Sequence, residues 1–157
     1  RRLRDLSYYQ DDPMVKRLLG LNRLPDASTV SRALSSIDDL SIERVRELCR
    51  NLVIERLKKI AICRVTFDFY GSVFSTQSRT TEGTAVGYNR KRRGARSYYP
   101  LFCTLAQTGQ VFDVYHRSGN VHDSHGAREF IVACITSLKK ALPWVKIEVR
   151  MDKCLFQ

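Results

Sequence analysis

The hydrophobic pattern of the chain changes near residue 60. Before that point, apolar residues recur at every third or fourth position, which is the period of an amphipathic helix. The longest such run starts at Ser41, a residue type that commonly caps helices, and its predicted inner stripe is Ile42, Val45, Leu48, Cys49, Leu52 and Leu57. A shorter helix is predicted after Pro25, with Val30, Ala33 and Leu34 along one face. Residues 1–60 are therefore predicted to form a helical N-terminal region.

After residue 60 the pattern becomes that of strands, because β-branched and aromatic residues take over. The predicted strands are residues 64–70, 98–107, 110–117 and 145–151, and Thr108 with Gly109 forms the tight turn between the second and third. A helix is predicted before the last strand, capped by Asp123 or Ser124 and ended by Pro143.

The predicted order of elements from residue 61 is strand, strand, strand, helix, strand. This is the order of the first part of a ribonuclease H-like fold, in which adjacent central strands bring distant acidic residues together. We therefore predict an α/β fold with a partial ribonuclease H-like mixed sheet over residues 61–157. The helical region of residues 1–60 precedes it.

The charge of the chain favours a polyanionic partner. The 27 Lys and Arg residues against 16 Asp and Glu give a net charge of +11. Such a surface gains affinity for DNA through counterion release, although a basic surface can also serve solubility alone. No apolar run approaches the roughly 20 residues of a membrane span, so no membrane partner is expected.

The five cysteines stand singly, at Cys49, Cys63, Cys103, Cys134 and Cys154. An odd count without a Cys-x-x-Cys pair argues against a disulfide framework and against a zinc site. The pattern predicts buried thiols in a reducing cytoplasm.

Two aspartates are the candidates for metal chemistry. Asp68 lies in an otherwise apolar predicted strand, where an unpaired charge is costly to bury, and Asp152 ends the last one. Metal-dependent phosphodiester cleavage needs carboxylates that share two Mg²⁺ ions about 3.5–4 Å apart. A structural role, in which each carboxylate accepts hydrogen bonds from the backbone or an arginine, is also open.

Several motifs of the second region resemble DDE-type transposases of bacterial insertion sequences, in particular the group whose first acidic segment reads like Asp-x-Asp-Gly-Ser. The matching blocks are residues 67–73 (FDFYGSV), 83–89 (GTAVGYN), 98–101 (YYPL), 118–124 (SGNVHDS) and 149–152 (VRMD), with a leader at residues 23–32. The resemblance implies DNA transposition on a ribonuclease H-like core. Mg²⁺, or Mn²⁺, would be held by two aspartates and a later glutamate.

Two departures from that family pattern bear on activity. Tyr70 stands where the group has its acid next to Gly-Ser, and a neutral phenol is a poor Mg²⁺ ligand. Asp68 shares the face of Tyr70 about 6.6 Å away, so we expect it to substitute in part. The chain also ends at Gln157 before a third acid, and Lys153 and Cys154 replace the small residues expected after Asp152. We expect an incomplete transposase chain that does not cleave DNA alone.

The predicted DNA contacts lie in a basic loop between two strands. Its cations are Arg90, Lys91, Arg92, Arg93 and Arg96. Such a cluster can grip successive phosphates, whereas the alternative is a solvated charged loop. The short helix after Pro25, with Arg32 facing outward, could read DNA in the manner of a helix-turn-helix or serve as a plain packing helix.

Four further residues lie near the predicted site or the predicted core in the sequence. His122 and His125 have the spacing His-x-x-His, but without further ligands they suit a loop-to-helix junction better than zinc. The resemblance implies that Asn120 and His122 lie at the edge of the active site. Trp144 is predicted to fill the core.

The sequence thus predicts a DNA transposase chain of the bacterial cytoplasm, associated with the nucleoid. Its expected partners are double-stranded DNA, as transposon ends and target, and a second copy in a synaptic complex. One alternative is a non-catalytic DNA-binding remnant, which would bind DNA without metal-dependent cleavage. The other is a ribonuclease H-like nuclease, which would hydrolyse DNA without joining it to a target.

Overall fold

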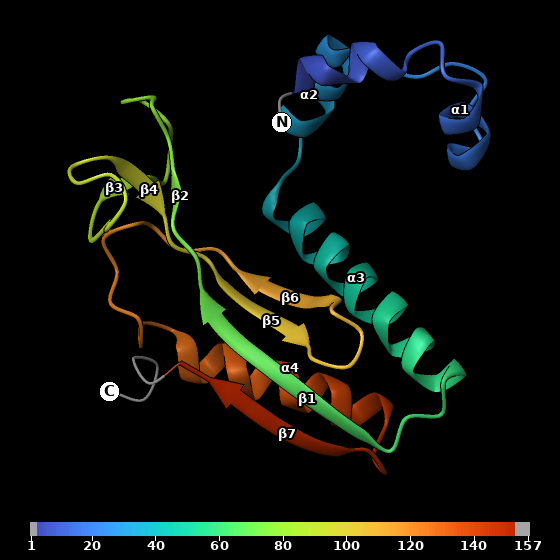
Figure 1. Cartoon of the computed structure of the whole chain (residues 1–157), viewed down its shortest axis with the longest axis vertical. Coiled ribbons are helices and arrows are strands. Elements are labelled where there is room, and N and C mark those ends of the chain that lie inside the picture. The colour runs from blue at the N-terminus through green and yellow to red at the C-terminus, as the bar shows by residue number, and fades with distance from the viewer. Residues whose placement is uncertain (1–2, 153–157) are drawn as a thin grey trace. The chain divides into compact units, whose positions relative to one another are not determined.

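The computed structural model describes residues 3–152, which divide into two compact units, one up to Arg44 and one from Val45 onward. The first unit is helical, as predicted, and the ribbon of Figure 1 traces its elements in blue. They are the 3-10 helix η1 (Leu3–Tyr9), α1 (Pro13–Leu19), α2 (Ala27–Ser35) and the start of α3 (Asp39–Lys59). Residues 45–59 of α3 belong to the second unit. None of the helices within residues 3–152 is long and apolar enough to cross a membrane.

Aspartate side chains cap two of these helices. At α1, Asp12 Oδ1 accepts hydrogen bonds from the Met14 and Val15 amides at 2.8 and 3.2 Å. At α3, Asp38 Oδ1 accepts from the Ser41 amide at 2.8 Å, so the predicted cap at Ser41 is wrong by three residues. Hydrogen bonding to Ser41 lowers the pKa of Asp38, since it stabilises the charged carboxylate. The helix predicted after Pro25 is confirmed as α2.

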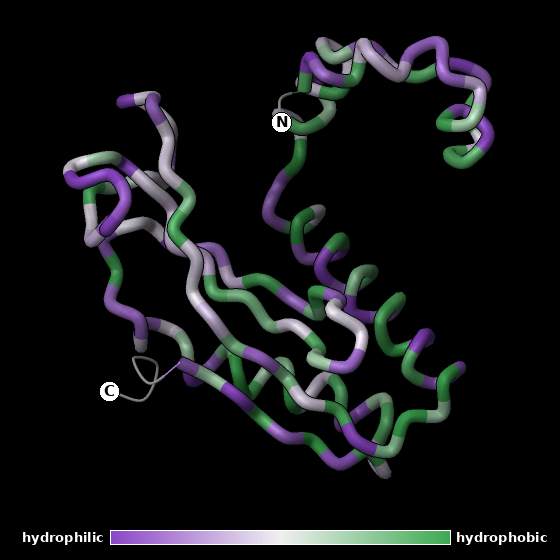
Figure 2. Tube along the Cα trace, viewed as in Figure 1, coloured by the Kyte–Doolittle hydropathy of each residue, from purple (hydrophilic) through white to green (hydrophobic). Residues whose placement is uncertain are grey.

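The buried face of α3 differs from the predicted stripe. Val53, Ile54 and Leu57 are buried, whereas the predicted Ile42, Val45, Leu48, Cys49 and Leu52 are exposed. Figure 2 shows hydrophobic and hydrophilic residues alternating along this helix. The difference arises because Arg46 and Arg50 lie on the buried face. Arg46 donates from Nε to Asp113 Oδ1 at 2.8 Å, and Arg50 donates from Nη1 to Asp113 Oδ2 at 2.8 Å. The Asp113 side chain is only 2% exposed.

The second unit is built on a four-stranded mixed sheet with the order β6-β5-β1-β7. Its strands are β6 (Val111–Tyr115), β5 (Leu101–Leu105), β1 (Arg64–Gly71) and β7 (Lys146–Met151). β1 pairs antiparallel with β5 and parallel with β7, which follows helix α4 (Ala127–Ala141). This confirms the predicted α/β class and the partial ribonuclease H-like order. The predicted hairpin between β5 and β6 is confirmed, but its turn is longer than the predicted Thr108-Gly109 pair: residues 106–110 connect the strands, and the Gly109 amide donates to the Leu105 carbonyl at 2.8 Å.

The predicted strand over residues 98–107 is interrupted. Pro100 has no amide hydrogen to donate to a ladder, and the chain forms two strands around it, β4 (Arg96–Tyr98) and β5. β4 is the centre of a second small sheet with β2 (Phe74–Ser75) and β3 (Ala85–Val86), which lies beyond the end of β1 (Figure 1). Strands of two or three residues are too short to show a period, so the sequence pattern did not predict this sheet.

One face of the four-stranded sheet forms the core. Odd-numbered residues of β1 and β5 pack with α4, which lies along that side in Figure 1, and with the second half of α3. Phe67 contacts Phe112 with ring centroids 5.0 Å apart, and Phe69 contacts Phe130 at 5.9 Å. Burial of each such side chain stabilises the fold by about 1.5–3 kcal/mol. The even-numbered side chains occupy the opposite face, here called the open face, whose members include Asp68, Tyr70, Phe102, Thr104 and Arg150.

Two further predictions are corrected around α4. Neither Asp123 nor Ser124 caps this helix; Gly126 precedes it with a left-handed backbone (φ 65°). A Cβ atom at Gly126 would lie 2.6 Å from the Tyr115 ring, so the position requires glycine. Trp144 is 66% exposed and is not a core residue, because the neighbouring Leu142 and Val145 fill that space.

The prediction that the cysteine thiols are buried is correct for two of the four cysteines that the structure describes. Cys103 and Cys134 are buried in the core, and burial raises the pKa of the Cys103 thiol. Cys49 and Cys63 are exposed, so the prediction is wrong for them. Cys154 lies outside the described residues.

Candidate functional site

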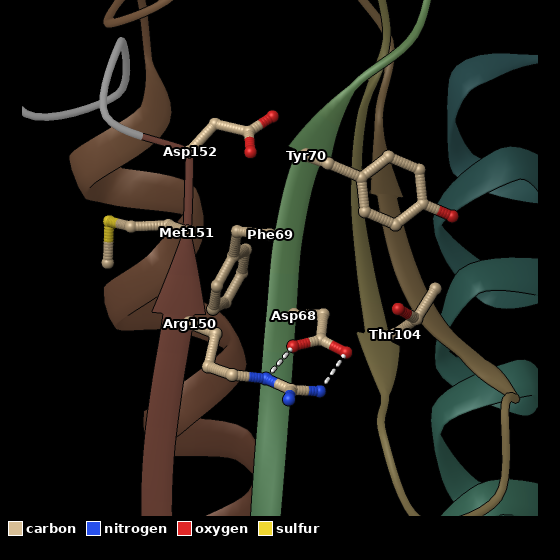
Figure 3. A pocket seen from close by; sticks show the side chains of 7 residues that line it. All are labelled: Asp68, Phe69, Tyr70, Thr104, Arg150, Met151 and Asp152. Carbon is tan, nitrogen blue, oxygen red and sulfur yellow. Dashed lines mark hydrogen bonds and ion pairs between the residues drawn. The ribbon is translucent and has the colours of Figure 1, made fainter.

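The pairing of β1 with β7 brings the predicted acidic residues to one pocket. Asp68 lies opposite Arg150 in the ladder, and both side chains are on the open face. Arg150 donates from Nε to Asp68 Oδ1 at 2.6 Å and from Nη2 to Oδ2 at 2.8 Å. Figure 3 shows this bidentate pair as two dashed lines. The hydrogen bonds from Arg150 and the charge of Asp68 raise the pKa of Arg150. Each oxygen of Asp68 thus accepts one hydrogen bond from a charged group.

Asp152 lies two residues beyond Arg150 and faces a different partner. The last paired residues of the ladder are Phe69 and Met151, so the next step places Asp152 opposite Tyr70. Strand geometry puts Asp152 Cα about 5 Å from that of Tyr70 and roughly 8 Å from that of Asp68. In Figure 3 its carboxylate lies at the level of Tyr70, farther along the strands than the Asp68 pair. The pocket has a volume of about 330 Å³ and is also lined by Thr104.

The donor set of this pocket does not fit a two-metal centre. Mg²⁺ requires a nearly octahedral shell of oxygen ligands. Asp68 already accepts two charged hydrogen bonds from Arg150, and Tyr70 offers a neutral phenol. Between residues 3 and 152, no group of three or more His, Cys, Asp or Glu side chains could hold a metal ion. Metal binding by Asp68 and Asp152 therefore stays a prediction, and it requires the ion pair with Arg150 to open.

Of the five cations predicted to contact DNA, the four at residues 90–93 face solvent, and these four residues are called the basic loop from here on. Arg90, Lys91, Arg92 and Arg93 are all exposed, and the part of the chain that the structure describes holds no ion pair to any of them. The loop is anchored by the buried Asn89, whose Oδ1 accepts from the amides of Lys91 and Arg92 at 3.1 and 3.0 Å. Asn89 Nδ2 donates to Ser75 Oγ at 2.7 Å. The side chain thereby holds the loop backbone in one turn.

Two further contacts fix the base of this loop. Arg96 donates from Nε to Thr84 Oγ1 at 3.0 Å and from Nη2 to the Thr84 carbonyl. Its guanidinium is therefore engaged in the fold, unlike the cations of the basic loop, and its predicted DNA contact stays untested. Gly87 packs against Gly119 so closely that a Cβ atom would lie 1.7 Å from the Gly119 carbonyl oxygen. A larger residue at position 87 would separate the two segments.

The segment between β6 and α4 is organised by a buried arginine that the sequence analysis did not single out. Arg117 is 3% exposed and donates to the carbonyls of Tyr99, Asp123 and His125 at 3.0, 2.8 and 2.9 Å. Its guanidinium also lies 5.0 Å from the centroid of the Tyr99 ring. Burial lowers the pKa of Arg117, but a guanidinium remains charged at neutral pH. No local sequence signal distinguishes this arginine from an exposed one.

Replacing Arg117 by methionine is expected to lower the free energy of unfolding by about 3 kcal/mol. The substitution would leave three backbone carbonyls without donors, and unsatisfied buried groups are costly. Urea unfolding of the variant measures this loss. Arg128→Met removes an exposed cation from α4 and should change stability by less than about 0.5 kcal/mol. Equal losses in the two variants would contradict a structural role for Arg117.

The remaining predicted residues are not among those that line the pocket. Asn120 and His122 are exposed on the segment that Arg117 organises, and neither lines the pocket. His122 Nδ1 lies 2.8 Å from Ser124 Oγ, which agrees with a role in the local turn. Arg32 is exposed on α2 of the first unit, with Nη2 3.4 Å from Thr29 Oγ1. Site roles for these three residues stay predictions.

Comparison with known proteins gives weak structural neighbours. No family model matches the chain, and no curated protein matches it significantly. A crystal structure of a pre-cleavage Mos1 transpososome aligns with a TM-score of 0.36 and 14% identity, over 97% of this chain and 52% of that one. A Mos1 transposase paired-end complex with the left transposon end aligns with a TM-score of 0.32 and 13% identity, over 88% of this chain and 47% of the other. The chain thus spans about half the length of the structures it matches.

Proposed function

We propose that this chain binds double-stranded DNA through its basic loop, as part of a DDE-type transposase, and that it does not cleave DNA by itself. The observation that carries the proposal is the set of four exposed cations on a turn fixed by Asn89. Because the turn is held in place, little conformational freedom of its backbone is lost when phosphates bind. The family assignment rests on the motifs of residues 67–152.

The pocket supports a non-catalytic role for this chain. Arg150 neutralises Asp68, and Tyr70 stands opposite the remaining carboxylate of Asp152. By the family resemblance, Asp68, Asp152 and a further carboxylate would hold Mg²⁺ or Mn²⁺ in a complete transposase, and the metal would supply Lewis-acid chemistry for phosphodiester cleavage. For that role, Asp68 must first exchange its two hydrogen bonds with Arg150 for a metal.

The proposal is tested by measuring the affinity for duplex DNA as a function of salt. Four phosphate contacts predict that log K falls with log salt with a slope of about −3.6. Incubation with terminal inverted-repeat DNA and Mg²⁺ or Mn²⁺ should give no cleaved strand. An affinity that does not change with salt would contradict the DNA-binding proposal.

The cleavage assay also separates the enzymatic alternatives. Robust hydrolysis by this chain would overturn the proposed inactivity. If the cleaved strand is then joined to target DNA, the chain is a complete transposase, whereas hydrolysis without joining indicates a nuclease. We further propose that two copies of the complete protein associate on paired transposon ends, which sedimentation with and without DNA would measure.

A further inference from the structure

One side of α3 carries an exposed apolar stripe, defined here as Ile42, Val45, Leu48, Cys49 and Leu52. Apart from Cys49, which is also exposed, these residues are 47–61% exposed. Spacings of three or four residues keep them on one side of the helix, because a turn takes about 3.6 residues. The buried residues of α3 lie on a neighbouring side, so the stripe is not needed to fill the core. Apolar surface gathered in one place is typical of an interaction site.

The charged residues of α3 differ between its two ends. The helix begins with Asp38 as its cap and Asp39 in its first turn, and its last turn carries Arg56, Lys58 and Lys59. Figure 1 shows α3 as one continuous helix between these ends. Two copies of α3 that pack antiparallel therefore bring the acidic end of each against the basic end of the other, whereas parallel packing brings like charges together.

Arg44 and Glu55 have the opposite charge to the ends they lie near, and they fit the same arrangement. Both are exposed. They are eleven positions apart, or about three turns, so they lie on the same flank of the stripe. In an antiparallel pair centred on residues 48–49, Arg44 of one copy comes within two positions of Glu55 of the other. Two such ion pairs can form, one at each end of the contact.

We infer that α3 is a self-association surface, on which the α3 helix of a second copy packs antiparallel through the same stripe. Val45 of one copy then lies opposite Leu52 of the other. Helix axes in such contacts are about 8–10 Å apart, which brings the two Cys49 Cα atoms to about 6 Å. A contact confined to one helix pair is near the lower limit of roughly 1,000 Å² for specific interfaces, so the dimer is transient, with a Kd on the order of 10 µM. The inference does not rest on the proposed DNA binding, since no DNA takes part in this contact.

Sedimentation equilibrium without DNA measures this association. The wild-type chain should convert from monomer to dimer between about 1 and 100 µM. Leu52→Glu places a charge within the contact and should raise the Kd at least about 30-fold. Val132→Glu makes the equivalent change at a residue of α4 that is 55% exposed, and it should leave the Kd unchanged. Circular dichroism checks that both variants are folded.

Cys49 reports the position of the contact. Diamide oxidises two neighbouring thiols to a disulfide by taking up their two hydrogen atoms, and about 6 Å between Cα atoms is within the range that a disulfide spans. At concentrations near the Kd, the wild-type chain should therefore form a covalent dimer linked through Cys49. Cys49→Ser should abolish this dimer, whereas Cys63→Ser, which removes another exposed cysteine, should retain it.

A charge exchange tests the antiparallel direction. Arg44→Glu should raise the Kd about tenfold, because two attractive pairs become repulsive. Adding Glu55→Arg restores opposite charges and should return the Kd to the wild-type value. In a parallel pair each residue would face its own counterpart, and Arg44→Glu would leave the Kd unchanged.

The outcomes separate this inference from the proposed function. A chain that stays monomeric up to about 100 µM, or a dimer that Leu52→Glu does not weaken, would overturn the inference and leave the DNA-binding proposal intact. A covalent dimer that persists in Cys49→Ser, or a loss in Arg44→Glu that Glu55→Arg does not reverse, would place the contact elsewhere and overturn it as well. A chain that dimerises as expected but does not bind duplex DNA would support the inference and contradict only the DNA-binding proposal.

Discussion

Replacing Arg90, Lys91, Arg92 and Arg93 together by glutamine is expected to weaken the binding of double-stranded DNA about 1000-fold at 0.15 M salt. Each phosphate contact releases about 0.9 counterion, so four contacts contribute a slope of about 3.6 in log K against log salt. The logarithm of 0.15 is about −0.8, so at 0.15 M salt this slope contributes a factor of about 1000 to the affinity constant relative to 1 M salt. The variant should therefore show both a weaker affinity and a much flatter salt dependence in an anisotropy titration.

A matched variant separates the position of the charges from their number. Arg56, Lys59, Arg128 and Lys140 are exposed cations of α3 and α4, and replacing them by glutamine changes the net charge by the same four units, from +11 to +7. This variant should keep most of the salt slope. If both variants lose affinity equally, DNA senses only the overall charge and the basic loop has no special role. Asn89→Ala keeps every cation and should cause a smaller loss, because the turn is no longer held.

Tyr70→Asp is expected to create a binding site for a divalent cation. The new carboxylate would face Asp152 across two parallel strands, with Cα atoms about 5 Å apart. Without metal the two carboxylates should repel each other and lower the stability of the fold. At a Mn²⁺ concentration 100 times the Kd, binding should raise the stability by about 2.7 kcal/mol, or roughly 5–10 °C in Tm for a chain of this size. Thermal unfolding in Mn²⁺ and in EDTA measures the difference.

Three comparisons test that interpretation. The wild-type chain and Tyr70→Asn should show no such shift, and adding Asp152→Asn to Tyr70→Asp should abolish it. Electron paramagnetic resonance of free Mn²⁺ gives the number of ions bound. A wild-type chain that binds Mn²⁺ as tightly as Tyr70→Asp would show that Asp68 and Asp152 suffice as ligands. That result would contradict the role assigned to Arg150.

The long elements were predictable because each carries many repeats of its own period. β1, β7 and α4 have six to fifteen residues, and the hairpin between β5 and β6 has Thr108-Gly109 within its turn. The buried face of α3 was not predictable from hydrophobicity, since Arg46 and Arg50 take core-facing positions to pair with Asp113. That pairing joins residues more than sixty positions apart, and no local pattern indicates it.

The candidate site was predicted to the level of topology but not to the level of register. The element order placed Asp68 and Asp152 on adjacent strands, and the structure confirms that the two strands pair. Which residues face each other depends on how the whole sheet packs on its core. As a result, the ion pair of Asp68 with Arg150 and the position of Tyr70 opposite Asp152 emerged only from the structure. Arg150 lies two residues before Asp152, and side chains two residues apart in a strand share a face. This alternation is the one sequence signal that could have placed Arg150 beside the acidic residues.

β7 is an edge strand of the four-stranded sheet, and its side chains affect how readily the protein aggregates at high concentration. Within residues 3–152, β7 pairs only with β1, so its outer backbone groups are a template on which another chain could add a strand. Lys146, Glu148 and Arg150 alternate along this edge with Ile147, Val149 and Met151. Charged side chains on an edge strand discourage such addition, and they therefore protect the protein against edge-to-edge aggregation.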